Sequence, residues 1–148
     1  MAKEIERKFL VKGNFLEHAV KKIKITQAYL SVDSLRTIRV RICDDKAFLT
    51  IKSQKNMIWF ERNEWEFELK LSDAKEILEI CLPGKIEKSR YMVPFGNHIF
   101  EVDVFHGNNE GLVIAEIELA NGNEWFEKPD WLGEEVTGRP EYYNSNLI

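Results

Sequence analysis

The chain has 148 residues, of which 44% are hydrophobic and 31% charged, a composition typical of one folded domain with its own core and not of a disordered chain. The net charge of −4 excludes a global positive field for nucleic acid, so any anion site must be a local group of bases. Charged residues interrupt the start of the chain, and no apolar run approaches the roughly 18 residues of a membrane span. With two cysteines, Cys43 and Cys81, and no disulfide framework, we expect a single cytoplasmic domain over residues 1–148, without nucleic-acid or membrane partners.

Alternation of apolar and polar residues with a period of two, the period of a β-strand, runs through most of the chain. It predicts eight strands, over residues 3–11, 25–32, 36–43, 46–53, 58–71, 86–93, 98–106 and 112–120. Asp44 and Asp45 are typical of a tight hairpin turn between two of these strands, and residues 107–109 of another turn.

Helical patterns are few and short. We expect one short helix over residues 14–22 and a second over 72–81, where Ser72 is a suitable N-cap residue. Residues 123–133 are expected to form one or two short turns, because Pro129 interrupts a helix.

Charged residues share one parity along the predicted strands, so they lie on one face of each, opposite apolar residues. In the first strand, for example, Glu4, Glu6 and Lys8 alternate with Ile5 and Phe9. The acids of this face are Glu4, Glu6, Glu64, Glu66, Glu68, Glu101, Asp103, Glu116 and Glu118, and the bases are Lys8, Arg39, Arg41, Lys46, Lys52, Arg62, Lys70, Lys88 and Arg90. Acids and bases form same-sign pairs on separate strands.

Two interpretations of the charged face compete. A solvent-facing antiparallel sheet also shows polar residues on one side, but it favours mixed charges, because like charges placed side by side are destabilising. Eight strands are enough to close a barrel. We therefore expect a mainly β protein of the α+β class, an eight-stranded antiparallel closed barrel with a charged lumen and a few helices packed outside.

A lumen with separate acidic and basic zones suggests a ligand of both signs, such as a complex of Mg²⁺ with a polyphosphate. Carboxylates bind hard divalent cations, while Arg and Lys bind phosphate. These are the components of phosphoryl transfer, in which catalysis is mostly positioning and charge neutralisation. Tyr29 shares the charged parity, either as a side chain that fills the lumen or as a hydrogen-bonding group or proton acceptor.

Eight motifs in order along the chain resemble the CYTH superfamily, also called triphosphate tunnel metalloenzymes. They are EIERKFLV, QAYLS, RTIRVRI, FLTIKS, EKSRY, FEVDVF, AEIEL and WLGEEVTG. The resemblance implies an eight-stranded tunnel that binds a triphosphate-containing small molecule with Mg²⁺ or Mn²⁺. It is strongest to small bacterial members that hydrolyse inorganic tripolyphosphate. Adenylate cyclase, thiamine or nucleoside triphosphatase activity, and polyphosphate binding without turnover are the alternatives, and both a monomer and a homodimer fit the sequence.

The resemblance also implies roles for individual residues of the charged face. Catalysis would centre on Tyr29, Lys8 and Glu6, with Tyr29 as a proton acceptor. The metal ligands would be Glu4, Glu6, Asp103, Glu116 and Glu118, and the phosphate-binding bases Lys8, Arg39, Arg41, Lys52, Arg62, Lys88 and Arg90. Glu64 and Glu66 would form a second acidic cluster. Near the C-terminus the chain departs from the family pattern at Pro140 and Glu141.

Overall fold

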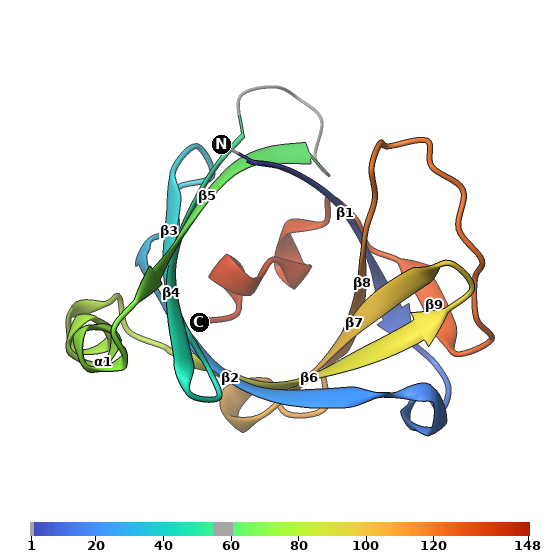
Figure 1. Cartoon of the computed structure of the whole chain (residues 1–148), viewed down its shortest axis with the longest axis horizontal. Coiled ribbons are helices and arrows are strands. Elements are labelled where there is room, and N and C mark those ends of the chain that lie inside the picture. The colour runs from blue at the N-terminus through green and yellow to red at the C-terminus, as the bar shows by residue number, and fades with distance from the viewer. Residues whose placement is uncertain (1, 55–60) are drawn as a thin grey trace.

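Antiparallel strands dominate the computed structural model, which describes residues 2–54 and 61–148 (Figure 1). The strands are β1 (Ala2–Val11), β2 (Lys21–Ser31), β3 (Thr37–Cys43), β4 (Lys46–Ser53), β5 (Glu61–Leu69), β6 (Ile86–Phe95), β7 (His98–Phe105), β8 (Val113–Glu118) and the short β9 (Leu132–Glu135). The helical elements are the α-helix α1 (Leu71–Ile80) and the single 3-10 turns η1 (Leu16–His18), η2 (Gly107–Asn109), η3 (Pro140–Tyr142) and η4 (Asn144–Asn146).

Pairing between the first and fifth strands closes the sheet into a barrel. The strand order is β5-β4-β3-β2-β6-β7-β8-β1, and β1 also pairs with β5. Residues 2–5 of β1 pair with β5, and residues 6–10 pair with β8. The predicted eight-stranded antiparallel closed barrel is therefore confirmed. The ninth strand extends it by pairing with β1 around Phe9 and Val11.

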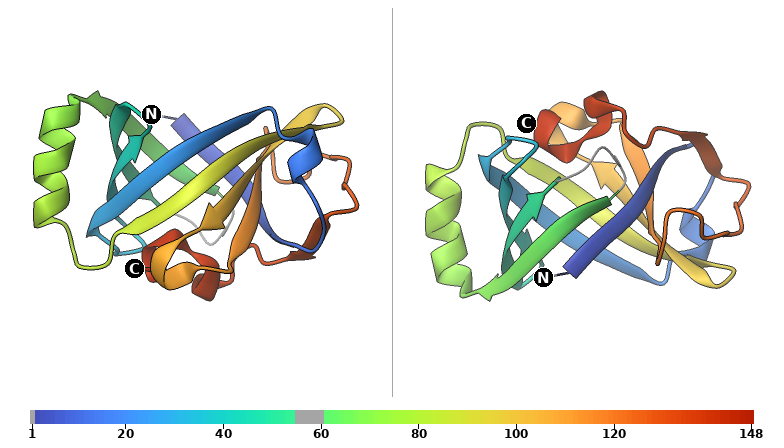
Figure 2. Two further views of the ribbon diagram at one scale, coloured as in Figure 1. Left: turned by 90° about the horizontal axis from the view of Figure 1, so that it is seen from below. Right: turned by 90° about the horizontal axis from the view of Figure 1, so that it is seen from above.

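The apolar face of the strands points outward and is covered in two places. The segment between β8 and β9 packs Phe126 and Trp131 against Phe100, with ring centroids 6.1 and 5.2 Å apart. On the other side of the barrel, α1 places the fully buried Ala74 in a cluster with Val40 (Figure 2). Complete burial of a side chain such as Phe100 contributes roughly 1.5–3 kcal/mol. These covers leave the charged face of the strands inside the barrel.

Two local predictions are wrong. Residues 14–22 form only the turn η1, because β2 already begins at Lys21, which pairs with Met92 of β6. Helix α1 starts one residue earlier than expected, with Lys70 rather than Ser72 at the N-cap.

A strand at 132–135 was not predicted at all, since its four residues show no clear alternation. The predicted strand 58–71 is confirmed from Glu61 to Leu69, and its residues 58–60 lie outside the described residues. Asp44 adopts the left-handed conformation (φ 55°) that a tight turn requires, as expected for this hairpin.

The C-terminal tail, residues 137–148, crosses one end of the barrel (Figures 1 and 2). Its side chains Tyr142 and Leu147 pack against an apolar part of the lumen that includes Tyr29, Ile86 and Ile114. This end of the lumen is therefore filled by apolar side chains, whereas Glu66 and Glu118 are exposed to solvent.

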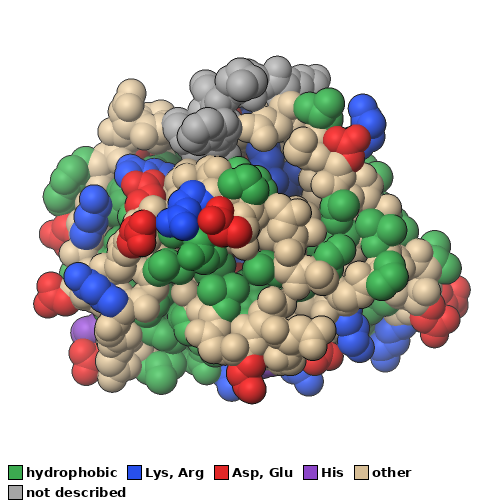
Figure 3. Space-filling model, turned by 180° about the vertical axis from the view of Figure 1, so that it is seen from behind, with side chains coloured by type: hydrophobic (Ala, Val, Ile, Leu, Met, Phe, Trp, Pro, Cys, Tyr) green, Lys and Arg blue, Asp and Glu red, His purple; other side chains and the backbone are tan. Residues whose placement is uncertain are grey.

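On the exterior face shown in Figure 3, Lys and Arg side chains are interspersed with Asp and Glu. Interspersed charges of both signs do not give the positive footprint that nucleic-acid binding favours. The described residues contain no helix with the length and apolar composition that a membrane span requires.

Candidate functional site

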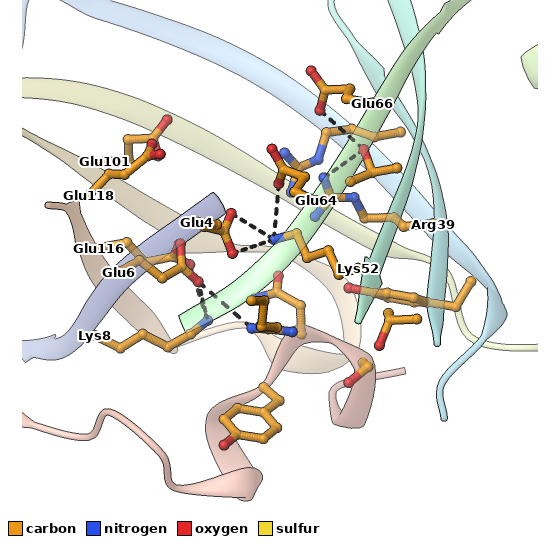
Figure 4. A pocket seen from close by; sticks show the side chains of 18 of the residues that line it. Glu4, Glu6, Lys8, Arg39, Lys52, Glu64, Glu66, Glu101, Glu116 and Glu118 are labelled. Atoms are coloured by element: carbon orange, nitrogen blue, oxygen red, sulfur yellow. Dashed lines mark hydrogen bonds and ion pairs between the residues drawn. The ribbon is translucent and has the colours of Figure 1, made fainter. Parts of the chain in front are cut away.

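The barrel encloses a cavity of ≈ 290 Å³ whose wall is the charged face of the strands (Figure 4). Of the residues predicted for the site, those that line the cavity are Glu4, Glu6, Lys8, Tyr29, Arg39, Arg41, Lys52, Arg62, Glu64, Glu66, Arg90, Glu116 and Glu118. Glu101 lines it as well, so all eight barrel strands contribute. Strand parity thus brings residues from distant parts of the sequence to one enclosed space.

Three glutamates, Glu4, Glu6 and Glu116, form the acidic cluster of this wall. The Nζ atom of Lys52 lies 2.9 Å from Glu4, and that of Lys8 lies 3.2 Å from Glu116 and 4.0 Å from Glu6. Burial and the neighbouring carboxylates Glu116 and Glu4 raise the pKa of Glu6 to about 8. Burial also acts to raise the pKa of Glu116, but Lys8, Arg90, a hydrogen bond with Glu6, and Lys88 together outweigh it and lower that pKa well below its ordinary value. At neutral pH the cluster therefore keeps a proton on Glu6.

The arginine pair, Arg39 and Arg41 of β3, has no carboxylate within 4.0 Å in the described part of the chain. The Arg39 Nη2 atom donates to the hydroxyl of Thr50 (3.2 Å), and its buried Nε atom has no hydrogen-bond partner there. Arg41 Nε donates to the amide oxygen of Gln27 (2.9 Å). Burial and the nearby Arg39 and Arg90 lower the pKa of Arg41 to about 10. Two guanidinium groups that lack a counter-charge in an enclosed cavity make a site for an anion.

Two predicted site residues, Lys88 and Asp103, lie behind the cavity wall, each 1% exposed. Arg90 donates from Nε and Nη2 to the two Asp103 oxygens at 2.8 and 2.9 Å, and Lys88 Nζ lies 2.7 Å from Asp103. Burial acts to raise the pKa of Asp103, but Arg90 and Lys88 outweigh it and lower that pKa to about 2. Burial lowers the pKa of Lys88 to about 7, and the nearby charges of Arg90 and Arg41 add to this effect against the attraction of Asp103. In this arrangement Asp103 fixes two bases, and its predicted role as a metal ligand stays a prediction.

Tyr29 is 3% exposed and lines the cavity at the end that the C-terminal tail covers. Its hydroxyl oxygen accepts a hydrogen bond from Gln27 Nε2 (3.2 Å), which leaves the hydroxyl hydrogen free to donate to a ligand. The ring of Tyr29 packs in the lumen with Ile86 and Ile114, and its role as a hydrogen-bonding group for the ligand or as a proton acceptor stays a prediction.

Several cavity residues were missed from the sequence. Thr50 lines the cavity, and Gln27 holds the lining residue Arg41; both have the parity of the charged face, but uncharged side chains on alternating strands carry no signal of a site. The tail residues 143–145 also line the cavity, and they come from a stretch without periodicity. Glu68, a member of the predicted charged face, is exposed and lies outside the cavity lining.

The acidic cluster has the donor chemistry for a divalent cation, since carboxylate oxygens are the ligands that Mg²⁺ and Mn²⁺ prefer. Burial and the neighbouring Glu116 and Glu4 disfavour the charged form of Glu6, which a bound cation would stabilise in place of a proton. Among the described residues no three acidic or imidazole groups are already drawn together as a metal site. Lys8 and Lys52 hold the carboxylates in ion pairs, so metal binding requires these side chains to turn.

Known proteins with similar sequences span the whole barrel. The chain matches the CYTH domain family over residues 2–146. It is 48% identical over 149 residues to an inorganic triphosphatase from Acetivibrio thermocellus, and the alignment covers 100% of this chain and 94% of that protein. It is 33% identical over 150 residues to an inorganic triphosphatase from Nitrosomonas europaea, and the alignment covers 97% of this chain and 95% of that protein.

Solved structures agree with the sequence relatives. The crystal structure of an inorganic triphosphatase aligns with a TM-score of 0.70 and 32% identity over 97% of this chain and 96% of that one. A protein from Pyrococcus horikoshii shares the fold, with a TM-score of 0.63 and 22% identity over 81% of this chain and 80% of that one. Because the family match extends over residues 2–146, this chain belongs to the CYTH domain family, as its motifs predicted.

Proposed function

We propose that this protein is a metal-dependent hydrolase of triphosphates that converts inorganic tripolyphosphate to pyrophosphate and phosphate. The observation that carries the proposal is the arginine pair, Arg39 and Arg41, which lacks a carboxylate partner in the described residues and shares one enclosed cavity with the acidic cluster. Two relatives that align over nearly their whole length are inorganic triphosphatases, which supports the same reaction class.

The size of the cavity favours a bare polyphosphate over a nucleotide. Pockets for drug-sized ligands run from about 300 to 1,000 Å³, and the cavity here, ≈ 290 Å³, lies at the bottom of that range. Its wall is almost entirely charged or polar, and a base or thiazole ring would require an apolar surface to stack on. We therefore rank inorganic tripolyphosphate above ATP and thiamine triphosphate.

Within this proposal, Glu4, Glu6, Glu116 and Glu118 would hold a divalent cation, Mg²⁺ or Mn²⁺. When bound, such a cation neutralises phosphate oxygens and can lower the pKa of water. Glu64 lies 3.6 Å from Lys52, which is also paired with Glu4, so it orients a base of the wall. We assign Asp103 to the support of Arg90 and Lys88 rather than to the metal.

The reaction breaks one bridging P–O bond, forms one P–O bond to the attacking water, and releases pyrophosphate. The arginine pair and Lys8 neutralise the charge of the substrate and of the departing pyrophosphate. Arg90 is held in one orientation by its two hydrogen bonds to Asp103, so it can meet a phosphate without reorganisation. The Tyr29 hydroxyl donates to a phosphate oxygen or orients the attacking water.

A substrate panel tests the proposal. Phosphate release from tripolyphosphate, pyrophosphate, ATP and thiamine triphosphate is measured with Mg²⁺, with Mn²⁺ and with EDTA, and the ATP reaction is also assayed for cyclic AMP. We expect metal-dependent turnover that is fastest with tripolyphosphate, and we expect Glu116→Gln to reduce it while Glu68→Gln, outside the cavity, does not. Tight tripolyphosphate binding without turnover by the wild-type protein would instead make it a binding module.

We also propose that the reaction takes place in the cytoplasm. Both Cys43 and Cys81 are free thiols, which is usual for proteins of a reducing compartment. Fractionation of the native cells, followed by detection of the protein, tests this assignment, and recovery from an extracytoplasmic fraction would contradict it.

A further inference from the structure

The first residue of the QAYLS motif, Gln27, has a buried amide side chain that lies next to the cavity lining. Gln27 of β2 is 0% exposed, and each of its polar atoms has a partner. Its Oε1 atom accepts from Arg41 Nε (2.9 Å), and its Nε2 atom donates to the Tyr29 hydroxyl (3.2 Å) and to Asn144 Oδ1 (3.3 Å). The Gln27 side chain thus connects Arg41 and Tyr29 of the cavity wall with the C-terminal tail.

Asn144 is the tail residue that completes this connection. Its Oδ1 atom accepts from Gln27 and also from the buried ammonium of Lys88 (2.7 Å). With Oδ1 used in this way, the Nδ2 group of Asn144 must point elsewhere, and within the described residues it has no partner. Asn144 also lines the cavity, so the tail reaches the space in which a ligand would bind.

The donors and acceptors leave a single orientation for both amides. Arg41 Nε can only donate, so the group of Gln27 that faces it must be the oxygen Oε1. The remaining contact between the two amides is then a donation from Gln27 Nε2 to Asn144 Oδ1. A chain of hydrogen bonds with one allowed direction fixes the side chains at both of its ends.

We propose that Gln27 and Asn144 act as a positioning pair, through which the C-terminal tail holds Arg41 and Tyr29 in the orientation that binds the triphosphate. The inference rests on the proposed function and deepens it: the tail is part of the substrate site as well as a cover for one end of the barrel. Gln27 acts through Arg41 and Tyr29, and Asn144 acts through Gln27.

A double-mutant cycle tests the pair. The variants are Gln27→Met, Asn144→Ala and the double variant. Asn146→Ala is the matched control, because Asn146 belongs to the same tail but its side chain donates to the Pro140 carbonyl (2.8 Å) and not to the cavity wall. We expect each single variant to raise KM for tripolyphosphate about tenfold, and the double variant to raise it about as much as one single variant. The control should keep the wild-type KM and kcat.

Binding without catalysis separates this inference from the proposed function. Calorimetric titration of tripolyphosphate in EDTA should show the same order of affinities, with wild type and Asn146→Ala binding more tightly than Asn144→Ala. If Asn144→Ala binds and turns over tripolyphosphate like wild type, the positioning role is wrong even though the enzyme is active. If wild type itself neither binds nor hydrolyses tripolyphosphate, the proposed function fails instead.

Stability measurements complete the test, because Gln27 is buried and its replacement affects the fold. Asn144 lies in the tail, and we expect Asn144→Ala to melt within about 2 °C of the Asn146→Ala control. If KM rises only in variants whose melting temperature is also lowered, the proposal is overturned, because the rise in KM would then come from destabilisation of the whole fold. Fully additive effects in the double variant would also overturn it, because the two amides would then act independently.

Discussion

Replacing Asp103 by asparagine removes a negative charge that is buried between two cations. Asp103 is 1% exposed and accepts hydrogen bonds from Arg90 at 2.8 and 2.9 Å, with Lys88 at 2.7 Å. Removing one partner of a buried ion pair costs about 3–5 kcal/mol, because the remaining charges stay buried without compensation. We expect Asp103→Asn to lower the free energy of unfolding by about that amount.

The lowered pKa of Asp103 gives an independent and smaller figure for the contribution of its charge to the free energy of unfolding. Its fall from 3.8 to about 2 corresponds to about 2 kcal/mol of stability at neutral pH. Because the folded pKa is the lower one, this contribution is complete above the unfolded pKa and is lost as the pH falls through 4 towards 2. Protonation costs less than substitution, since the protonated carboxyl group retains both oxygens as hydrogen-bond acceptors.

Urea unfolding at pH 7 in EDTA, followed by circular dichroism, measures the effect on stability. The matched control is Glu118→Gln, because Glu118 is exposed at the cavity and is one of the proposed metal ligands. We expect the control to unfold within about 0.5 kcal/mol of wild type and to bind Mn²⁺ more weakly. If Asp103→Asn keeps wild-type stability but loses Mn²⁺ affinity, our assignment of Asp103 to the bases is refuted and the metal-ligand prediction stands.

Three further predictions concern the arginine pair, the outer surface and the metal. Arg41→Met should melt at or above the wild-type temperature, because burial, Arg39 and Arg90 disfavour the Arg41 charge, yet bind tripolyphosphate at least about tenfold more weakly; a strongly lowered melting temperature would contradict this. Glu135→Gln should cost about 0.5 kcal/mol or less and leave kcat unchanged, since its pair with Arg7 (2.7 Å) is partly exposed. Because Arg7 lowers the pKa of Glu135, that contribution should fade as the pH falls below 4.5, and urea unfolding at pH 7 and pH 4 measures it. EDTA should reduce tripolyphosphate hydrolysis to background, and added Mg²⁺ or Mn²⁺ should restore it; full activity in EDTA would exclude the metal-dependent mechanism.

Strand parity predicted the barrel because its signal is local and repeated. Glu4, Glu6 and Lys8 share a face for geometric reasons that depend on nothing outside their own strand, and the same holds for Arg39 and Arg41. Closure of the sheet was predicted on two grounds. Eight strands are enough to close a barrel, and same-sign pairs of charges are unfavourable on an open sheet surface.

The missed features depend on contacts between distant parts of the chain. Lys21 belongs to β2 because it pairs with Met92, and no pattern within residues 14–22 reveals that partner. The short β9 exists because β1 continues past the end of β5 and leaves an edge to pair with.

The site shows the same limit at the level of single side chains. Asp103 has the parity of a metal ligand, but its pairing with Arg90 and Lys88 is visible only once β6 and β7 lie side by side. Gln27 and Asn144 are uncharged and 117 residues apart, so no spacing rule connects them.

The central claim is that the charged lumen binds a triphosphate together with a divalent cation. A crystal structure of the protein with Mn²⁺ and tripolyphosphate, with the metal located by its anomalous scattering, tests the claim most directly. We predict a manganese peak within bonding distance of the acidic cluster and the phosphates of the ligand in contact with Arg39 and Arg41. Ordered tripolyphosphate and manganese on the outer surface, with an empty lumen, would contradict the account.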